Sequence, residues 1–188
     1  KNMQITLPLV EELHHPAMRD RHWKQLMKAM AVSFTMDANF NLGDLIALKP
    51  FEFVDDVGEI VDRAQKELII EKQLKKIEEV WANLDIQFVL WEEGNELQLL
   101  FIPEEVSEAL EENQVQMQNL MASKYVQNNS DFLAIVSGWQ QKLGNVDSCL
   151  QSWMEVQKKW QNLQSIFVGS ADIRIQLPED SKRFDGID

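Results

Sequence analysis

Residues 131–168 decide the fold class, and they read DFLAIVSGWQQKLGNVDSCLQSWMEVQKKWQNLQSIFV. Apolar residues recur there three and four positions apart, which is the spacing of one face of an α-helix. At about 1.5 Å per residue, a helix of this length would extend roughly 57 Å. The spacing slips once after Leu150, where two steps of three follow each other, so we predict a long helix and not a strict coiled coil. The predicted packing seam of this helix and of an earlier one consists of Trp81, Trp139, Leu143, Val146, Leu150, Trp153, Val156 and Trp160.

A second long helix is predicted upstream, over residues 56–83. Its apolar residues follow the same spacing, but the stripe shifts around the helix between Leu68 and Ile70. Residues 86–102 change to alternating apolar and polar positions on either side of a turn at residues 92–95. This alternation predicts a β-hairpin, which should lie against helices because an isolated hairpin is marginally stable in water.

Proline residues mark the shorter predicted elements. Pro16 and Pro103 are each expected at the first position of a helix, where the missing N–H costs nothing. Asn113 is a candidate point of division within the second of these helices. A short helix is predicted over residues 42–48, and a last one should begin at Pro178.

The predicted fold is mainly α: an elongated bundle of long antiparallel helices with one β-hairpin. Residues 1–55 should form short helices and loops, including a loop over residues 34–41. Residues 56–126 should form a helix, the hairpin and a helix, and residues 131–188 the long helix and the start of a next element. We expect all of them to belong to one segment that is a piece of a larger polypeptide.

The composition restricts the classes of partner. The formal net charge is -13, which disfavours binding to nucleic acid and docking on an anionic membrane surface. The only cysteine is Cys149, so no disulfide can form within the chain, and we expect this side chain to be a small buried hydrophobe.

Signals of catalysis and of cofactor binding are weak. No glycine opens the phosphate-binding pattern Gly-x-x-x-x-Gly-Lys-Ser/Thr. His15 and His22 are seven residues apart, and a capping or surface role is expected for them in place of a metal site. Adjacent acids are expected to be solvated charges, and Glu71 is expected to pair with Lys75 on a mixed-charge, solvent-facing helix face.

Several stretches resemble dynein heavy chains. The run LHHPAMRDRHW at residues 13–23 resembles the arginine-rich segment near the start of the dynein linker. Residues 53–60, 67–81, 109–126 and 153–167 are similar to later parts of the same linker. The closing run at residues 171–184, ADIRIQLPEDSKRF, looks most like axonemal heavy chains, especially those of the outer arm.

This resemblance implies a mechanical function. In dyneins the linker is a helical arm that lies across a ring of AAA+ ATPase modules, bends during the nucleotide cycle and straightens in the power stroke. The implied setting is cytoplasmic, in the axoneme of a cilium or flagellum. The implied partners are the AAA+ ring of the same heavy chain, intermediate and light chains through the tail, and microtubules through the stalk. The segment itself would be non-catalytic and without cofactor, with ATP and magnesium bound elsewhere in the motor.

A lever must also bend at a defined place. Gly138 and Gly144 each disfavour helix by about 1 kcal/mol relative to alanine. We therefore predict a hinge between Tyr125 and Gly144, with the alternative that the two glycines only allow close helix contact. Two other functions are open: a spectrin-like helical scaffold without a conformational cycle, and an enzyme that uses an acidic pair.

Overall fold

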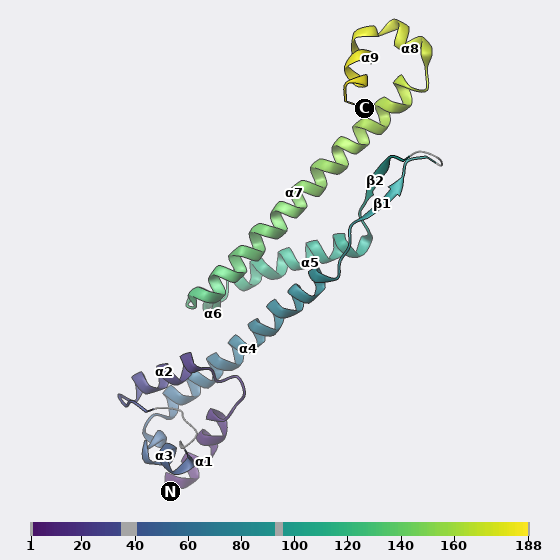
Figure 1. The fold of residues 1–188 in the computed structure, drawn as a ribbon. Helices are drawn as coiled ribbons and strands as arrows, with labels where there is room; N and C mark the ends of the chain where they lie inside the picture. The colour runs from purple at the N-terminus through teal and green to yellow at the C-terminus, as the bar shows by residue number, and fades with distance from the viewer. Residues whose placement is uncertain (1, 35–40, 93–95, 188) are drawn as a thin grey trace. The chain divides into compact units, whose positions relative to one another are not determined.

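A computed structural model describes residues 2–34, 41–92 and 96–187 (Figure 1). The chain is mainly α-helical with one two-stranded antiparallel sheet, which confirms the predicted fold class. Contacts divide it into two units. Unit 1 contains Lys1–Glu79 and Ser123–Ser130, and unit 2 contains Val80–Ala122 and Asp131–Asp188. The predicted loop at 34–41 and turn at 92–95 lie largely outside the described residues.

Unit 1 is built from short helices around the first part of a long one. Its elements are α1 (Asn2–Leu13), α2 (Asp20–Ala29), α3 (Leu42–Ala47), the 3-10 helix η1 (Pro50–Glu52), α4 (Val54–Ala82) up to Glu79, and α6 (Lys124–Gln127). Helix α1 was not predicted. The core of unit 1 is formed by Leu9, Leu13, Leu26, Met30, Leu45, Val57, Ile60 and Val61.

Two details of unit 1 differ from the predictions. Pro16 does not begin a helix, since α2 starts at Asp20. The His22 side chain accepts the N–H of Arg19, the residue before the first turn of α2. The apparent shift in the apolar stripe of α4 is not a break, because α4 is continuous over 29 residues. Its buried positions pass from Ala64 to Ile70 through Glu67, so a carboxylate occupies one core position of the stripe.

Unit 2 is built on two antiparallel helices and a hairpin. Its elements are β1 (Gln87–Leu90), β2 (Gln98–Phe101), α5 (Glu104–Met121), α7 (Ser130–Phe167), α8 (Ala171–Gln176) and α9 (Pro178–Asp185). The strands pair in the register Gln87↔Phe101 and Leu90↔Gln98, and α9 begins at the predicted Pro178. Helix α7 is continuous over 38 residues.

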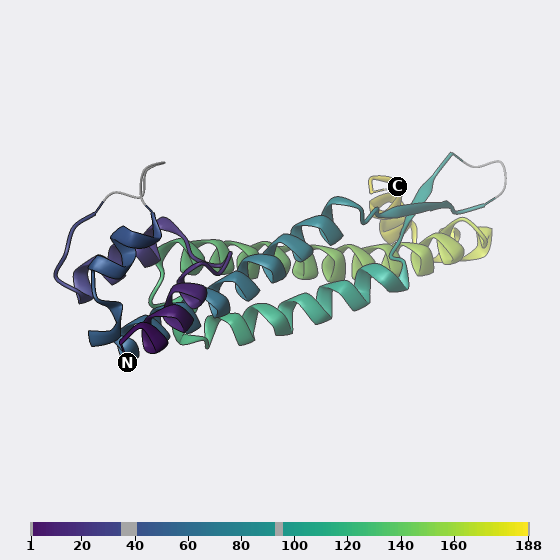
Figure 2. The same ribbon diagram turned by 90° about the horizontal axis from the view of Figure 1, so that it is seen from below.

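Side-chain pairs along α5 and α7 fix the antiparallel arrangement. Gln114 of α5 donates to Asp147 of α7, while Ser137, near the start of α7, contacts Met121 at the end of α5. Figure 2 shows the ribbons of the two helices. Asn113 does not divide α5: it is buried, and its amide donates to the carbonyl of Ala109 one turn earlier. Pro103 is the N-cap residue of α5 and not its predicted first residue, which is Glu104.

The end of unit 2 folds back on α7. Arg174 of α8 binds both carboxylate oxygens of Asp185 at 2.6 and 3.0 Å and donates to the carbonyl of Phe167. Phe184 stacks on Phe167 with ring centroids 5.5 Å apart. None of the described helices combines the length and the apolar character that crossing a membrane requires.

Candidate functional site

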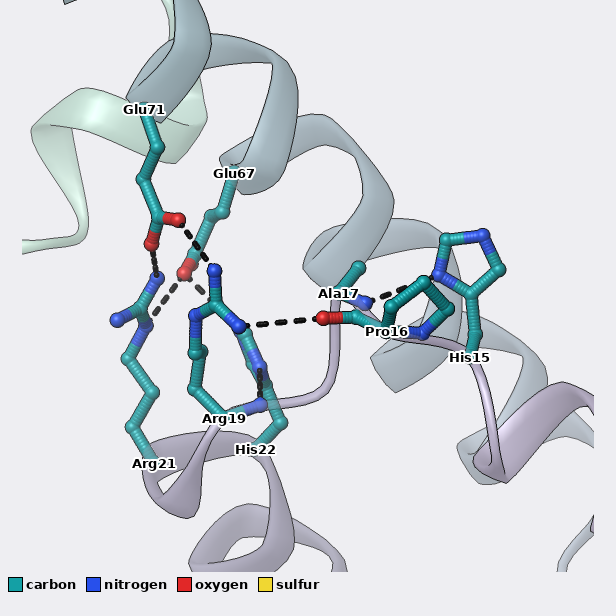
Figure 3. A network of polar contacts seen from close by, with 8 residues as sticks. All are labelled: His15, Pro16, Ala17, Arg19, Arg21, His22, Glu67 and Glu71. Carbon is teal, nitrogen blue, oxygen red and sulfur yellow. Dashed lines mark hydrogen bonds and ion pairs between the residues drawn. The ribbon is translucent and has the colours of Figure 1, made fainter. Parts of the chain in front are cut away.

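A cluster of charged side chains joins the start of α2 to the middle of α4 within unit 1 (Figure 3). Glu67 and Glu71 lie one turn apart on α4, so both carboxylates point to the same side of the helix. Arg19 and Arg21 approach them from α2 and the residue before it. Two guanidinium groups thereby offset the repulsion between two neighbouring carboxylates.

The contacts in this cluster are short and shared. Arg21 donates from Nε to Glu67 at 2.6 Å and from its terminal nitrogen to Glu71 at 3.0 Å. Arg19 donates to the other oxygen of Glu71 at 2.9 Å and to the carbonyl of Pro16 at 3.1 Å. A guanidinium has no acceptor atom, so the Arg19 side chain cannot accept the N–H groups at the start of α2. It instead connects the backbone at Pro16 to Glu71 of α4.

His22 is the most buried member of the cluster, with no exposed side-chain surface. Its Nδ1 accepts the N–H of Arg19 at 3.0 Å, so that nitrogen carries no proton. Nε2 therefore carries the proton and donates it to Glu67 at 3.0 Å. Burial, which outweighs the attraction of Glu67, lowers the pKa of the His22 imidazole below its ordinary value near 6.5.

Burial and hydrogen bonds also oppose each other at the other charged groups. Burial alone would raise the pKa of the Glu71 carboxyl, but the hydrogen bonds from Arg19 and Arg21 hold it below its ordinary value. Desolvation likewise works against the charge of Arg21, yet its bonds to the two glutamates raise its pKa. With His22 neutral, the two arginines and two glutamates balance in charge. Their hydrogen bonds hold α2 against α4, so we call the cluster of Arg19, Arg21, His22, Glu67 and Glu71 the joint between α2 and α4.

A polar cleft of about 380 Å³ lies beside this joint in unit 1. It is lined by residues of α2, α4 and α6, and the hydroxyl of Tyr125 donates to Asp62 at 3.1 Å across it. Tyr125, one of the predicted hinge residues, therefore ties α6 to α4. Among the described residues, no three or more histidine, cysteine, aspartate or glutamate side chains are arranged so that they could hold a metal ion.

A second fixed joint holds the hairpin on α7 in unit 2. The side-chain amide of Gln157 bonds to both backbone groups of Leu100: it accepts the N–H at 2.8 Å and donates to the carbonyl at 3.0 Å. Leu100 pairs with Phe88 across the hairpin, so Gln157 takes the place of a third strand at the free edge of β2. Trp91 packs edge-on against Trp160 with centroids 5.7 Å apart.

The predicted packing seam of α7 is covered only in part. Leu143 and Leu150 are buried, whereas Trp153 is 49% and Val156 is 66% exposed. Helix α5 starts at Glu104 and reaches α7 near Leu150, and farther along the ring of Phe88 in the hairpin contacts Trp153. The remaining members are partly buried: Trp81, Trp139, Val146 and Trp160.

The two hinge glycines lie inside the unbroken helix α7. A Cβ atom added to Gly138 or to Gly144 would meet no neighbouring atom within 4 Å. The alternative reading, in which these glycines allow close helix contact, is therefore wrong for the described structure. Tyr125 belongs by its contacts to unit 1, while both glycines belong to unit 2.

Three side chains differ from the predictions in their surroundings. Cys149 is exposed and not buried, because it lies on a different side of α7 from the buried Leu143 and Leu150. Glu71 binds arginines of the α2 region and not Lys75, which pairs with Glu79 instead. His22 is indeed a capping residue, but it is buried and not at the surface, whereas His15 accepts the N–H of Ala17.

Sequence reasoning missed both joints. Arg19 and Arg21 entered the sequence analysis only through the family resemblance, no role was predicted for Gln157, and the capping role expected for His22 did not include a bond to Glu67. One signal for Glu67 was present: the apolar stripe of α4 loses a member where Glu67 stands. A charged residue at a core position indicates a partner that neutralises it.

Comparison with known proteins gives the family. The family described as "Dynein heavy chain, N-terminal region 2" matches residues 1–188. The chain is 57% identical over 187 residues to the "Dynein beta chain, flagellar outer arm" of Chlamydomonas reinhardtii and 52% identical over 188 residues to the "Dynein beta chain, ciliary" of Tripneustes gratilla. It is 50% identical over 187 residues to the "Dynein axonemal heavy chain 9" of Homo sapiens.

These matches cover 100% of this chain and 4% of each relative's length. The match extends over both units, including the residues of the two joints. The chain therefore belongs to the dynein heavy chain family, in the part described as N-terminal region 2.

Proposed function

We propose that this segment is part of the mechanical linker of an axonemal dynein heavy chain, where it transmits the nucleotide-driven motion of the AAA+ ring as a power stroke. Support for the axonemal setting comes from the names of the relatives, which are flagellar, ciliary and axonemal chains. The segment is proposed to be non-catalytic, with ATP and magnesium bound elsewhere in the heavy chain.

One observation carries the mechanical part of the proposal: the 38-residue helix α7 is supported at two places within unit 2, at Leu150 and at Gln157. Helix α5 packs on it through Leu110 and Leu150, and the Gln157 amide fixes the hairpin farther along. Close-packed side chains resist deformation, so α7 is expected to transmit force where Leu150 and Gln157 support it. The joint between α2 and α4 provides a similar support in unit 1.

The proposed setting includes the partners of a complete motor. The AAA+ ring of the same heavy chain would drive the segment, microtubules would be bound through the stalk, and intermediate and light chains through the tail. The proposed location is the axoneme of a cilium or flagellum. The chain covers 4% of the length of these relatives, so the partners are proposed for the complete heavy chain.

Loosening one brace in the intact heavy chain tests force transmission. Leu150→Ala should weaken the packing of α5 on α7 by about 2 to 5 kcal/mol, because Leu150 is buried. Val156→Ala is the matched control, since Val156 lies on the same helix but is exposed. We expect Leu150→Ala to lower microtubule-gliding velocity while ATP hydrolysis continues, and Val156→Ala to leave both unchanged.

A helical scaffold without a conformational cycle predicts another result. In that case Leu150→Ala would leave the ratio of gliding velocity to ATP hydrolysis as it is in the unaltered motor. Equal changes in both rates, or no change in either, would thus contradict a role in force transmission.

The hinge is proposed to include Gly138 and Gly144, and a glycine outside that region provides its control. Alanine at both positions should stiffen α7 without a clash, because a Cβ atom meets open space at each. Gly58→Ala makes the same change in α4, also in open space. Slower gliding with the double variant, and normal gliding with Gly58→Ala, is the expected outcome. Normal gliding with the double variant would place the bending point elsewhere.

A further inference from the structure

The groove between α5 and α7 combines an apolar floor with acidic edges. It measures about 410 Å³ and lies entirely within unit 2. Leu110, Leu150 and Met154 contribute apolar surface to it. Glu111 and Asp147 stand on its opposite edges, one on each helix.

The carboxylate of Asp147 is held in place but not neutralised. It accepts from Gln151 at 2.8 Å and from Gln114 at 3.4 Å, and both donors are neutral amides. Among the described residues no lysine, arginine or histidine lies within ion-pair distance of Asp147 or Glu111. An oriented carboxylate at the edge of an apolar groove is a ready acceptor for a cation.

The surrounding sequence makes this uncompensated charge exceptional. Residues 80–122 contain no lysine, arginine or histidine. The acidic residues in the same stretch are Asp85, Glu92, Glu93, Glu96, Glu104, Glu105, Glu108, Glu111 and Glu112. A second acidic copy of this chain would be repelled there, so the charge favours a basic partner.

We propose that this groove receives a helical segment of the same heavy chain, from outside residues 1–188, which presents lysine or arginine beside apolar side chains. A groove between two antiparallel helices accommodates a third helix that inserts apolar anchors, and the flexible Met154 side chain can adapt to them. Lysine or arginine on that helix would reach Asp147 and Glu111 at the edges.

The length of the polypeptide outside this segment favours a partner within the same chain. This chain spans 4% of its relatives, so most of the heavy chain is tethered to it covalently. Tethering raises the effective concentration of such a segment well above that of a separate protein. The inference depends on membership of the heavy-chain family and not on the proposed power stroke.

Carboxylate footprinting of the purified intact heavy chain tests the inference. A carbodiimide and glycine ethyl ester convert accessible carboxylates to amides, and mass spectrometry measures the rate at each one. Glu111 is the reporter, and Glu112 is the matched control, because it is exposed on the same helix outside the groove. We expect Glu111 to react roughly tenfold more slowly than Glu112 at low ionic strength, as for a site about nine-tenths occupied.

High salt and Asp147→Asn should each abolish the difference, because both remove the attraction to the cation. Equal rates at Glu111 and Glu112 at low salt would overturn the inference. Protection that persists in Asp147→Asn would also count against it. Protection that disappears when associated chains are removed would assign the groove to a separate protein and so reject a partner within the chain. Gliding velocity is a separate readout, so failure here leaves the proposed mechanical role untouched.

Discussion

Glu67→Gln is the sharpest perturbation of the joint between α2 and α4. The side chain is only 5% exposed, and it accepts from Arg21 at 2.6 Å and from His22 at 3.0 Å. A hydrogen bond to a charged group contributes about 1.5 to 3 kcal/mol and a neutral one about 1 kcal/mol, so removing the charge costs roughly 1 to 4 kcal/mol over two bonds. Arg21 is 36% exposed and keeps Glu71, so solvent screening favours a value of about 2 kcal/mol.

Hydrogen exchange in the intact heavy chain measures this loss locally. If α2 opens by detaching from α4, then about 2 kcal/mol corresponds to roughly 30-fold faster exchange of its amides. Glu78→Gln makes the same substitution at an exposed position of α4 and should change exchange by less than about 0.5 kcal/mol. Unchanged protection of α2 in Glu67→Gln, or an equal effect of Glu78→Gln, would contradict a stabilising role for the Glu67 charge.

Three further predictions concern His22, Gln157 and the two glycines of α7. Because the pKa of His22 is lower in the folded state than in the unfolded state, the unfolded state binds more protons. The amides of α2 should be fully protected from hydrogen exchange above pH about 6.5 and less protected below it. His22→Asn should flatten this dependence of protection on pH. Gln157→Glu removes the donor to the Leu100 carbonyl and should loosen β2 by about 1 to 3 kcal/mol in hydrogen exchange. Gly138→Ala and Gly144→Ala should each slow exchange in α7 by about 1 kcal/mol, since both fit without a clash.

The long helices and the hairpin could be predicted because their signals are local. Three-and-four spacing gave α7 to within a residue at each end, and strict alternation gave β1 and β2. Pro178 marked the start of α9 for an equally local reason, the fixed φ angle of proline.

The joints could not be predicted because they connect residues far apart in the sequence. Arg21 and Glu67 are separated by 46 positions, and Leu100 and Gln157 by 57. Periodicity shows which face of a helix is apolar but not which element covers it or where that cover ends. For this reason Trp153, which continues the apolar spacing of α7, was predicted to be packed and is exposed.

The most direct test of the account measures whether the segment moves during the nucleotide cycle. Cys149 is exposed on α7 and accepts a fluorescent label once other reactive cysteines of the heavy chain are replaced. A second label is attached outside residues 1–188, on the ATPase part of the same chain. A linker predicts that energy transfer between the labels switches between at least two values as ATP is bound and hydrolysed. A single constant value throughout active turnover would contradict the mechanical role proposed for this segment.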